Sequence, residues 1–225
     1  MFGSLNSLTM KTKHDASILA PFDEQIEGLR NVGHQMWTRG WSLGTSSNYS
    51  VVVGEDPKHL LVTASGMDKG HLRASDFVVV DTSGHPISPD QPKSSAETLL
   101  HCVAVEMGAG AVLHTHSPWA TVLSEHFSAQ GGLEIAGFEM LKGLQGITTH
   151  ESRVWLPIFD NTQNIPELAA QVREYVANNG NPPLYGYLIR RHGMYTWGKT
   201  LADATRHIEV LEFLLECIGR QISIR

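Results

Sequence analysis

The chain has 225 residues, of which 41% are hydrophobic and 18% charged, a balance typical of globular proteins with a sizeable core. Its formal net charge at pH 7 is −6 and its basic residues are scattered, which argues against nucleic acid or an anionic membrane as a partner. The longest apolar runs are too short to span a membrane, and the first residues lack the apolar stretch of a signal peptide, so we expect a cytoplasmic protein.

The histidine and cysteine contents give two further expectations. The chain has 12 histidines, an unusual number for this length, which invites a search for a metal site. Its two cysteines, Cys102 and Cys217, lie on the apolar faces of helical patterns. We expect both to be reduced core residues rather than the halves of a disulfide.

The chain begins with a segment that shows no periodic pattern. We expect residues 1–20 to form a loosely ordered arm and residues 21–225 to form a single domain. Apolar residues at helical spacing predict a first helix from Phe22 to about Arg39.

The middle of the chain predicts strands followed by a helix. Residues 50–90 are typical of an antiparallel meander, with β-branched runs separated by turns rich in glycine and serine. Ser94 or Ser95 is the expected N-cap of a helix that continues to Met107. A short strand is expected at 111–113.

The second half of the chain alternates helices and short strands. Ser117 is an expected N-cap and Pro118 suits the first helical position after it. Thr200 is the expected cap of the last helix, whose apolar face is most simply explained as core. The other expected elements are strands at 154–157 and 185–189 and a helix at 166–178.

A His-x-His pair stands at the end of the strand predicted at 111–113. In extended chain, residues i and i+2 point to the same side, so His114 and His116 face one place. Two neutral imidazoles placed in this way suit a divalent metal, although two hydrogen-bonded core histidines explain the pair about equally well. His192, beside Gly193 at a strand end, is the candidate third ligand; His101, on a helix, and His150, in a loop, are less suitable.

Three hydroxyl-rich and glycine-rich stretches could bind a phosphate. They are the loop containing Asn48, the pair Ser65 and Gly66, and the helix start at Ser95. Backbone N–H groups and hydroxyls gathered in this way suit an anion. Each stretch alone is more often a plain turn or cap.

Two glutamates are candidate proton carriers. Glu139 lies three residues before Lys142, a spacing that favours a simple ion pair on a helix face. The alternative is a carboxylate in a partly dry cleft, suited to moving protons. Glu97, near the helix start, is either a capping acid or a second catalytic candidate.

Taken together, these stretches resemble the class II aldolase-like family, a zinc-dependent group that includes sugar-phosphate aldolases and 4-epimerases. The resemblance covers nearly the whole chain, and the combination is more specific than any one motif. The stretches that carry it, in chain order, are Gly44–Ser50, Ser65-Gly66, Ser95-Ala96-Glu97, His114-Thr115-His116 and Arg191-His192-Gly193.

The resemblance implies a three-layer α/β/α sandwich around a mostly antiparallel sheet. It also implies a homotetramer with active sites near subunit interfaces, a small sugar-phosphate substrate, and one Zn²⁺ per subunit. The zinc ligands would be His114, His116 and His192.

Within the group, the stretches 60–70, 139–143 and 192–198 are most similar to the branch that dehydrates a methylthio-substituted ketopentose phosphate in methionine salvage. This implies a hydro-lyase with Glu139 as its acid/base. Family aldolases carry Ser-Ser-Glu where this chain has Ser95-Ala96-Glu97, so Glu97 stays open as the second candidate.

Other assignments and alternatives follow from the same resemblance. The expected phosphate contacts are Asn48, Ser65, Gly66, Ser95 and, as an added charge, Lys142. Apolar character alone suggests Phe138, Met140 and Tyr195 for the methylthio end. The first alternative is a class II sugar-phosphate aldolase or epimerase using the same metal site. The second is a non-catalytic scaffold of the adducin kind.

Overall fold

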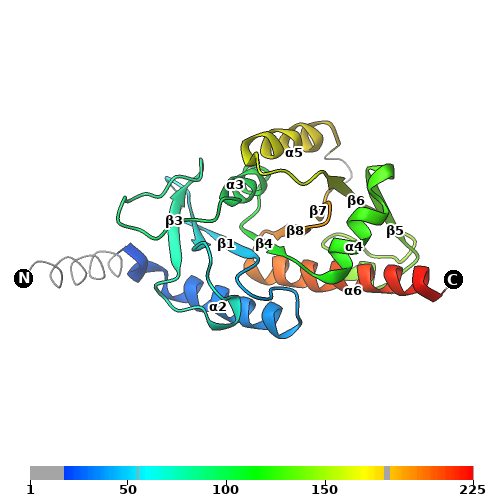
Figure 1. Cartoon of the computed structure of the whole chain (residues 1–225), viewed down its shortest axis with the longest axis horizontal. Coiled ribbons are helices and arrows are strands. Elements are labelled where there is room, and N and C mark those ends of the chain that lie inside the picture. The colour runs from blue at the N-terminus through cyan, green and yellow to red at the C-terminus, as the bar shows by residue number, and fades with distance from the viewer. Residues whose placement is uncertain (1–17, 55, 180–182, 225) are drawn as a thin grey trace, which may run out of the picture.

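A single mixed sheet organises the chain (Figure 1). The computed structural model describes residues 18–54, 56–179 and 183–224, so most of the expected N-terminal arm lies outside it. Within these ranges eight strands form the order β3-β2-β1-β4-β8-β7-β6-β5. All neighbouring pairs are antiparallel except β6 with β7. The assignment of residues 21–225 to one domain stays a prediction.

The elements have the following bounds. The strands are β1 (Asn48–Val53), β2 (His59–Thr63), β3 (Phe77–Asp81), β4 (Ala111–Thr115), β5 (Gly132–Ala136), β6 (Arg153–Phe159), β7 (Gly186–Ile189) and β8 (Gly193–Gly198). The α-helices are α2 (Asp23–Thr38), α3 (Thr98–Glu106), α4 (Pro118–His126), α5 (Ile165–Asn179) and α6 (Leu201–Ile224). Short 3-10 turns are η1 (Ala20–Phe22), η2 (Lys69–His71), η3 (Ser128–Gln130) and η4 (Glu139–Gly143).

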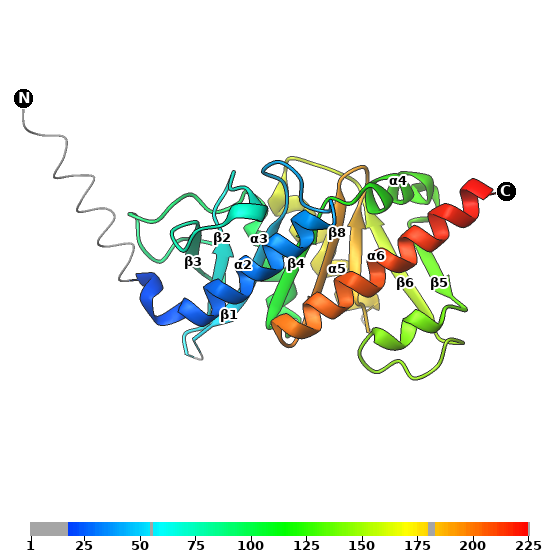
Figure 2. The same ribbon diagram turned by 90° about the horizontal axis from the view of Figure 1, so that it is seen from below.

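Helices cover both faces of the sheet. Helices α2 and α6 lie on one face, crossing the strands in Figure 2, and α3 and α5 lie on the other (Figures 1 and 2). One core cluster joins α2, α4 and α6 to the sheet, and a second joins α3 and α5 to it. The expected three-layer sandwich is therefore confirmed. It explains why the meander strands are nearly continuous apolar runs, because they are buried on both faces.

The last helix illustrates how local pattern and packing agree. Thr200 accepts a hydrogen bond from the amide of Asp203, as the predicted cap requires. Ala204, Ile208, Leu211 and Leu215 are fully buried against the sheet. Complete burial of a leucine or isoleucine side chain contributes about 1.5–3 kcal/mol, so this face anchors α6 under the centre of the sheet.

Three local expectations are corrected and two are confirmed. Helix α3 begins at Thr98, later than expected, because the carbonyl of Ser95 accepts both the amide and the hydroxyl of Thr98 in a turn. Strands β5 and β8 were not expected, and β8 lies in the centre of the sheet. Ser117 caps α4 as predicted. Both cysteines are free, Cys102 buried and Cys217 half-buried. No helix in the described ranges could span a membrane.

Candidate active site

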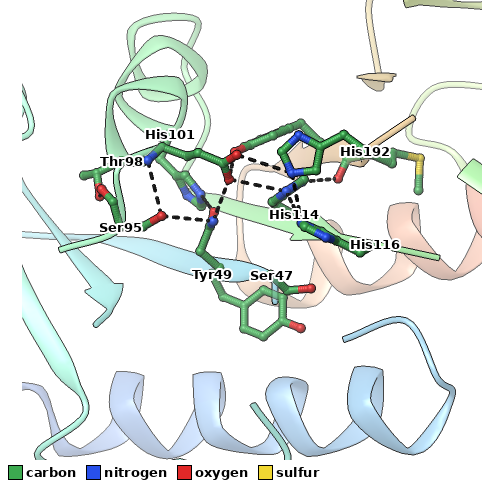
Figure 3. Close-up of polar contacts among 12 residues, drawn as sticks. Ser47, Tyr49, Ser95, Thr98, His101, His114, His116 and His192 are labelled. Atoms are coloured by element: carbon green, nitrogen blue, oxygen red, sulfur yellow. Dashed lines mark hydrogen bonds and ion pairs between the residues drawn. The ribbon is translucent and has the colours of Figure 1, made fainter. Parts of the chain in front are cut away.

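Three histidines converge where β4 ends (Figure 3). His114 is on β4, His116 directly follows it, and His192 lies in the turn between β7 and β8. The Nε2 atom of His116 is 2.8 Å from that of His114 and 3.1 Å from that of His192. The three histidines named from the sequence are thus brought together.

Backbone features hold the His192 turn against β4. A Cβ on Gly193 would lie 2.0 Å from the carbonyl oxygen of Thr115, so only glycine permits this close approach. Helix α4 holds the other side of the turn: the hydroxyl of Thr121 donates to the carbonyl of His192 at 3.0 Å. The hydroxyl of Ser124 accepts the amide of Arg191 at 3.0 Å.

Burial keeps two of the three histidines, His114 and His116, in the neutral form that a metal needs. Burial, reinforced by the neighbouring imidazoles, lowers the pKa of His114 well below its usual value. Burial also lowers the pKa of His116 to about 4. The Nδ1 of His114 lies 2.9 Å from the carbonyl oxygen of Met194, to which it donates, so its Nε2 carries the lone pair. The ligand nitrogens of His114, His116 and His192 all lie within 4.8 Å of one another, which fits a divalent metal.

The register of the sheet places polar side chains beside these histidines. Asn48 on β1 pairs with His114 on β4, which pairs with Tyr195 on β8. Paired residues in neighbouring strands point to the same face, so the three side chains form a row toward α3. The rings of His114 and Tyr195 stack with centroids 4.0 Å apart.

Glu97, immediately before α3, completes this end of the site. Its Oε2 accepts from Asn48 Nδ2 and from the Tyr195 hydroxyl, each at 2.9 Å. Oε2 is 3.4 Å from His114 Nε2, and Oε1 is 3.4 Å from His192 Nε2. The structure therefore places the second glutamate candidate directly beside the three histidines.

Glu139, the first candidate for the acid/base, lies in another part of the folded chain, away from the three histidines. It is on η4, 68% of its side chain is exposed, and it pairs with Lys142 and His150. The ion pair favoured by the sequence spacing is therefore present. Nearby Gln145 lines a cavity of about 380 Å³ with Ala109, which precedes β4. Glu139 is thus at the opposite end of the sheet from the histidines within one chain.

Four of the five expected phosphate contacts lie near one another. Asn48 Nδ2 donates to Ser95 Oγ at 3.3 Å. An isolated bridge pairs Ala64 with Ser94, which places Ser65 and Gly66 beside the start of the α3 segment. Ser65 and Gly66 are exposed, and nothing occupies the space where a Cβ on Gly66 would lie. Lys142 is not part of this group.

Sequence reasoning missed Lys69 near the site and considered His101 only as a less suitable metal ligand. Lys69 is buried, donates to the carbonyl of Met67 at 2.6 Å, and has a pKa lowered by burial to about 8. His101 is buried beside Asn48. The hydroxyl of Tyr195, a residue suggested for the methylthio end, donates to Glu97. No spacing in the sequence signals these contacts, because they depend on how distant elements pack.

A mostly antiparallel α/β/α sandwich with three histidines at the end of a central strand defines a protein of the class II aldolase type, with a site that could hold a metal. Residues 27–218 match the family model "Class II Aldolase and Adducin N-terminal domain", so the chain belongs to this family.

Solved structures agree on the fold. The L-fuculose-1-phosphate aldolase of Thermus thermophilus superposes with a TM-score of 0.68 over 88% of this chain and 96% of its own, at 22% identity. Another L-fuculose 1-phosphate aldolase gives 0.71 over 89% and 88% of the two chains, at 20% identity. At such identities the likeness concerns the fold alone.

Curated relatives are more similar in sequence. A protein of Marinobacter nauticus named methylthioribulose-1-phosphate dehydratase is 49% identical over 201 residues, 88% of this chain and 94% of its own. A protein of the same name from Xanthomonas campestris pv. campestris is 45% identical over 224 residues, 98% of this chain and 99% of its own.

Proposed function

We propose that the chain is a hydro-lyase that dehydrates 5-methylthioribulose 1-phosphate to 5-methylthio-2,3-dioxopentyl phosphate in methionine salvage. The observation that carries the proposal is near full-length identity of 45–49% to relatives named for this activity, together with the three-histidine site. The substrate is a 2-ketose phosphate, which suits a site with a metal at one end and anion-binding loops at the other.

The metal we propose is Zn²⁺, one per subunit, held by His114, His116 and His192. Neutral imidazole nitrogens are ordinary zinc ligands, and three of them leave room for substrate oxygens. Bound there, zinc supplies Lewis acidity that makes the C3 proton beside the C2 carbonyl acidic.

We assign the proton transfer within one chain to Glu97. Two donors, Asn48 and Tyr195, hold Oε2, which leaves Oε1 3.4 Å from His192 Nε2. The carboxylate removes the C3 proton, and the C4 hydroxyl then leaves as water with a returned proton. The resulting enol tautomerises to the diketone.

A catalytic role for Glu139 also stays a proposal, and it needs a second copy of the chain. Its exposed position at the other end of the sheet means that a neighbouring copy would have to present it to the histidines. The homotetramer with sites near subunit interfaces would allow this, and both the tetramer and the cytoplasmic location stay predictions.

For the phosphate we propose the group of Asn48, Ser65, Gly66 and Ser95. Lys69 lies under this group, since its ammonium reaches the carbonyl of Met67 directly after Gly66. A buried cation behind exposed backbone amides favours a bound anion. Lys142 would join only from a neighbouring copy.

The first test is analysis of the products formed by the zinc-loaded protein from methylthioribulose 1-phosphate, by mass and proton NMR. We expect loss of one water with the carbon chain intact. Dihydroxyacetone phosphate with a two-carbon methylthio aldehyde would instead establish a class II aldolase. An unchanged substrate and no bound zinc would support the adducin-like scaffold.

A further inference from the structure

A buried chain of hydrogen bonds leads from the sheet interior to Glu97. We call its members Ser50, His101, Asn48 and Glu97 the Ser50–Glu97 chain. The hydroxyl of Ser50 lies 2.7 Å from His101 Nδ1, His101 Nε2 bonds Asn48 Oδ1, and Asn48 Nδ2 lies 2.9 Å from Glu97 Oε2. Ser50, His101 and Asn48 are each at least 95% buried.

In the Ser50–Glu97 chain, the donors and acceptors allow the hydrogen bonds to run in one direction only. An ionised carboxylate only accepts, so the amide nitrogen of Asn48 must face Glu97 and its oxygen must face His101. His101 must then carry its proton on Nε2, and its Nδ1 accepts from Ser50. Burial lowers the pKa of His101 to about 3, so the imidazole is neutral and has a single tautomer here.

The orientation of Asn48 matters because both of its amide protons are committed. One goes to Glu97 and the other to Ser95 at 3.3 Å. If the amide turned over, its oxygen would face the Glu97 carboxylate, and two acceptors in contact repel. The carboxylate would then move from its place 3.4 Å from the ring nitrogens of both His114 and His192.

We propose that His101 is a positioning residue: through Asn48 it holds the Glu97 carboxylate beside the three histidines. Ser50 supports it by selecting the tautomer that donates to Asn48. The edge of the His101 ring against Tyr195, with centroids 5.7 Å apart, places it next to the other donor that holds Glu97. The kinetic consequence rests on the proposed dehydratase function, whereas the consequence for metal affinity does not.

Three variants of the full-length protein test this. H101M keeps a side chain of similar size but removes the donor to Asn48, and H101Q supplies an amide donor at the reach of Nε2. H207M is the matched control, because His207 is equally buried and also bonded through both nitrogens, to Trp197 and Gln145, at the opposite end of the sheet. Each is measured for kcat, KM, thermal stability and Zn²⁺ affinity by competition with a chromophoric chelator.

For H101M we expect kcat and Zn²⁺ affinity each to fall about 10–100-fold, the usual cost of losing a group that orients a metal-site residue. KM should change less than kcat, because Asn48 is the one proposed phosphate contact that His101 touches in the described structure. H101Q should recover most of both losses. H207M should lose stability but keep kcat and affinity.

Two results would overturn the proposal: equal kcat and affinity in H101M and H207M, or no recovery in H101Q. If H101M does not fold, Ser50→Ala decides, since it removes only the hydroxyl that selects the tautomer. Wild-type kcat and affinity in that variant would also overturn the proposal. A wild-type protein that binds zinc but does not dehydrate the substrate would refute the proposed function, and the affinity comparison would still judge the role of His101.

Discussion

The two ends of the sheet each present a glutamate, and their surroundings differ. Glu97 has 16% of its side chain exposed and accepts from Asn48 and Tyr195 beside three histidines. Glu139 has 68% exposed and pairs with Lys142 and His150 at the surface. The same residue type is held by converging donors at one end and largely solvated at the other.

The difference shows what makes a carboxylate useful in a single chain. In a site partly shielded from water, each hydrogen bond is stronger, and the carboxylate oxygen that would contact the substrate is held in place. Every buried acceptor there needs a donor. The exposed pair is screened by water and salt and leaves the carboxylate mobile. Only a neighbouring copy could change the surroundings of Glu139.

Removing one imidazole should give the largest effect at the histidine end. In His116→Ala the site loses one of three nitrogens, so we expect loss of zinc at equilibrium and a fall in kcat/KM of about 10³-fold or more, since a bound metal contributes several kcal/mol to such a transition state. Zinc content by atomic emission and steady-state kinetics measure both. Full activity in a zinc-free variant would contradict the assigned site.

The two glutamates can be compared directly. Glu97→Gln, assayed at saturating Zn²⁺, should lower kcat about 10²–10⁴-fold, the usual contribution of a positioned acid or base. Glu139→Gln should lose as much only if a neighbouring copy brings it to the histidines. Each variant is assayed with its oligomeric state measured by light scattering. Loss in Glu139→Gln alone would transfer the proton-transfer role from Glu97 to Glu139.

The buried histidine end should also make the metal-free protein sensitive to acid. The pKa of His101 is about 3 when folded and near 6.5 when unfolded, so below pH 6.5 the unfolded chain binds a proton that the native state does not. Stability should fall as the pH drops from 6.5 toward 3, by up to about 1.4 kcal/mol per pH unit from this group. Glu212, whose pKa burial raises to about 7, acts in the opposite direction between about pH 7 and 4.5.

Urea unfolding at a series of pH values, with chelator present, measures this slope. H101Q should show a shallower fall in stability than wild type, because glutamine does not titrate. An identical slope in the two proteins would mean that His101 is not the group responsible.

The smallest effect is expected at the exposed end. Lys142→Ala removes the ion pair with Glu139, and exposed pairs of this kind are screened by water, so the unfolding temperature should move by less than about 2 °C. Differential scanning calorimetry at low and high salt measures it. A larger shift that disappears when the protein is diluted to monomers would place this pair in an interface.

Much of the local structure could be predicted because its causes are local. Each of these features depends on residues within a few positions of one another: the caps at Ser117 and Thr200, the apolar face of α6, and the two same-side histidines at the end of β4. His192 was named as the third ligand from its place beside Gly193 at a strand end. The resemblance to a family supplied the layered fold, since it covers nearly the whole chain.

What only the tertiary structure decided depends on register and packing. Strand β8 has no clear alternation of its own and is held by β4 and β7 on either side. The pairing of β1, β4 and β8 brings Asn48, His114 and Tyr195 into one row, although the first and last are 147 positions apart in the chain. Against that row α3 sets Glu97 and His101, while η4 carries Glu139 to the other end of the sheet. The sequence by itself determined which side chains could bind a metal and move a proton; packing over long range decided which of them meet, because no short-range pattern encodes those contacts.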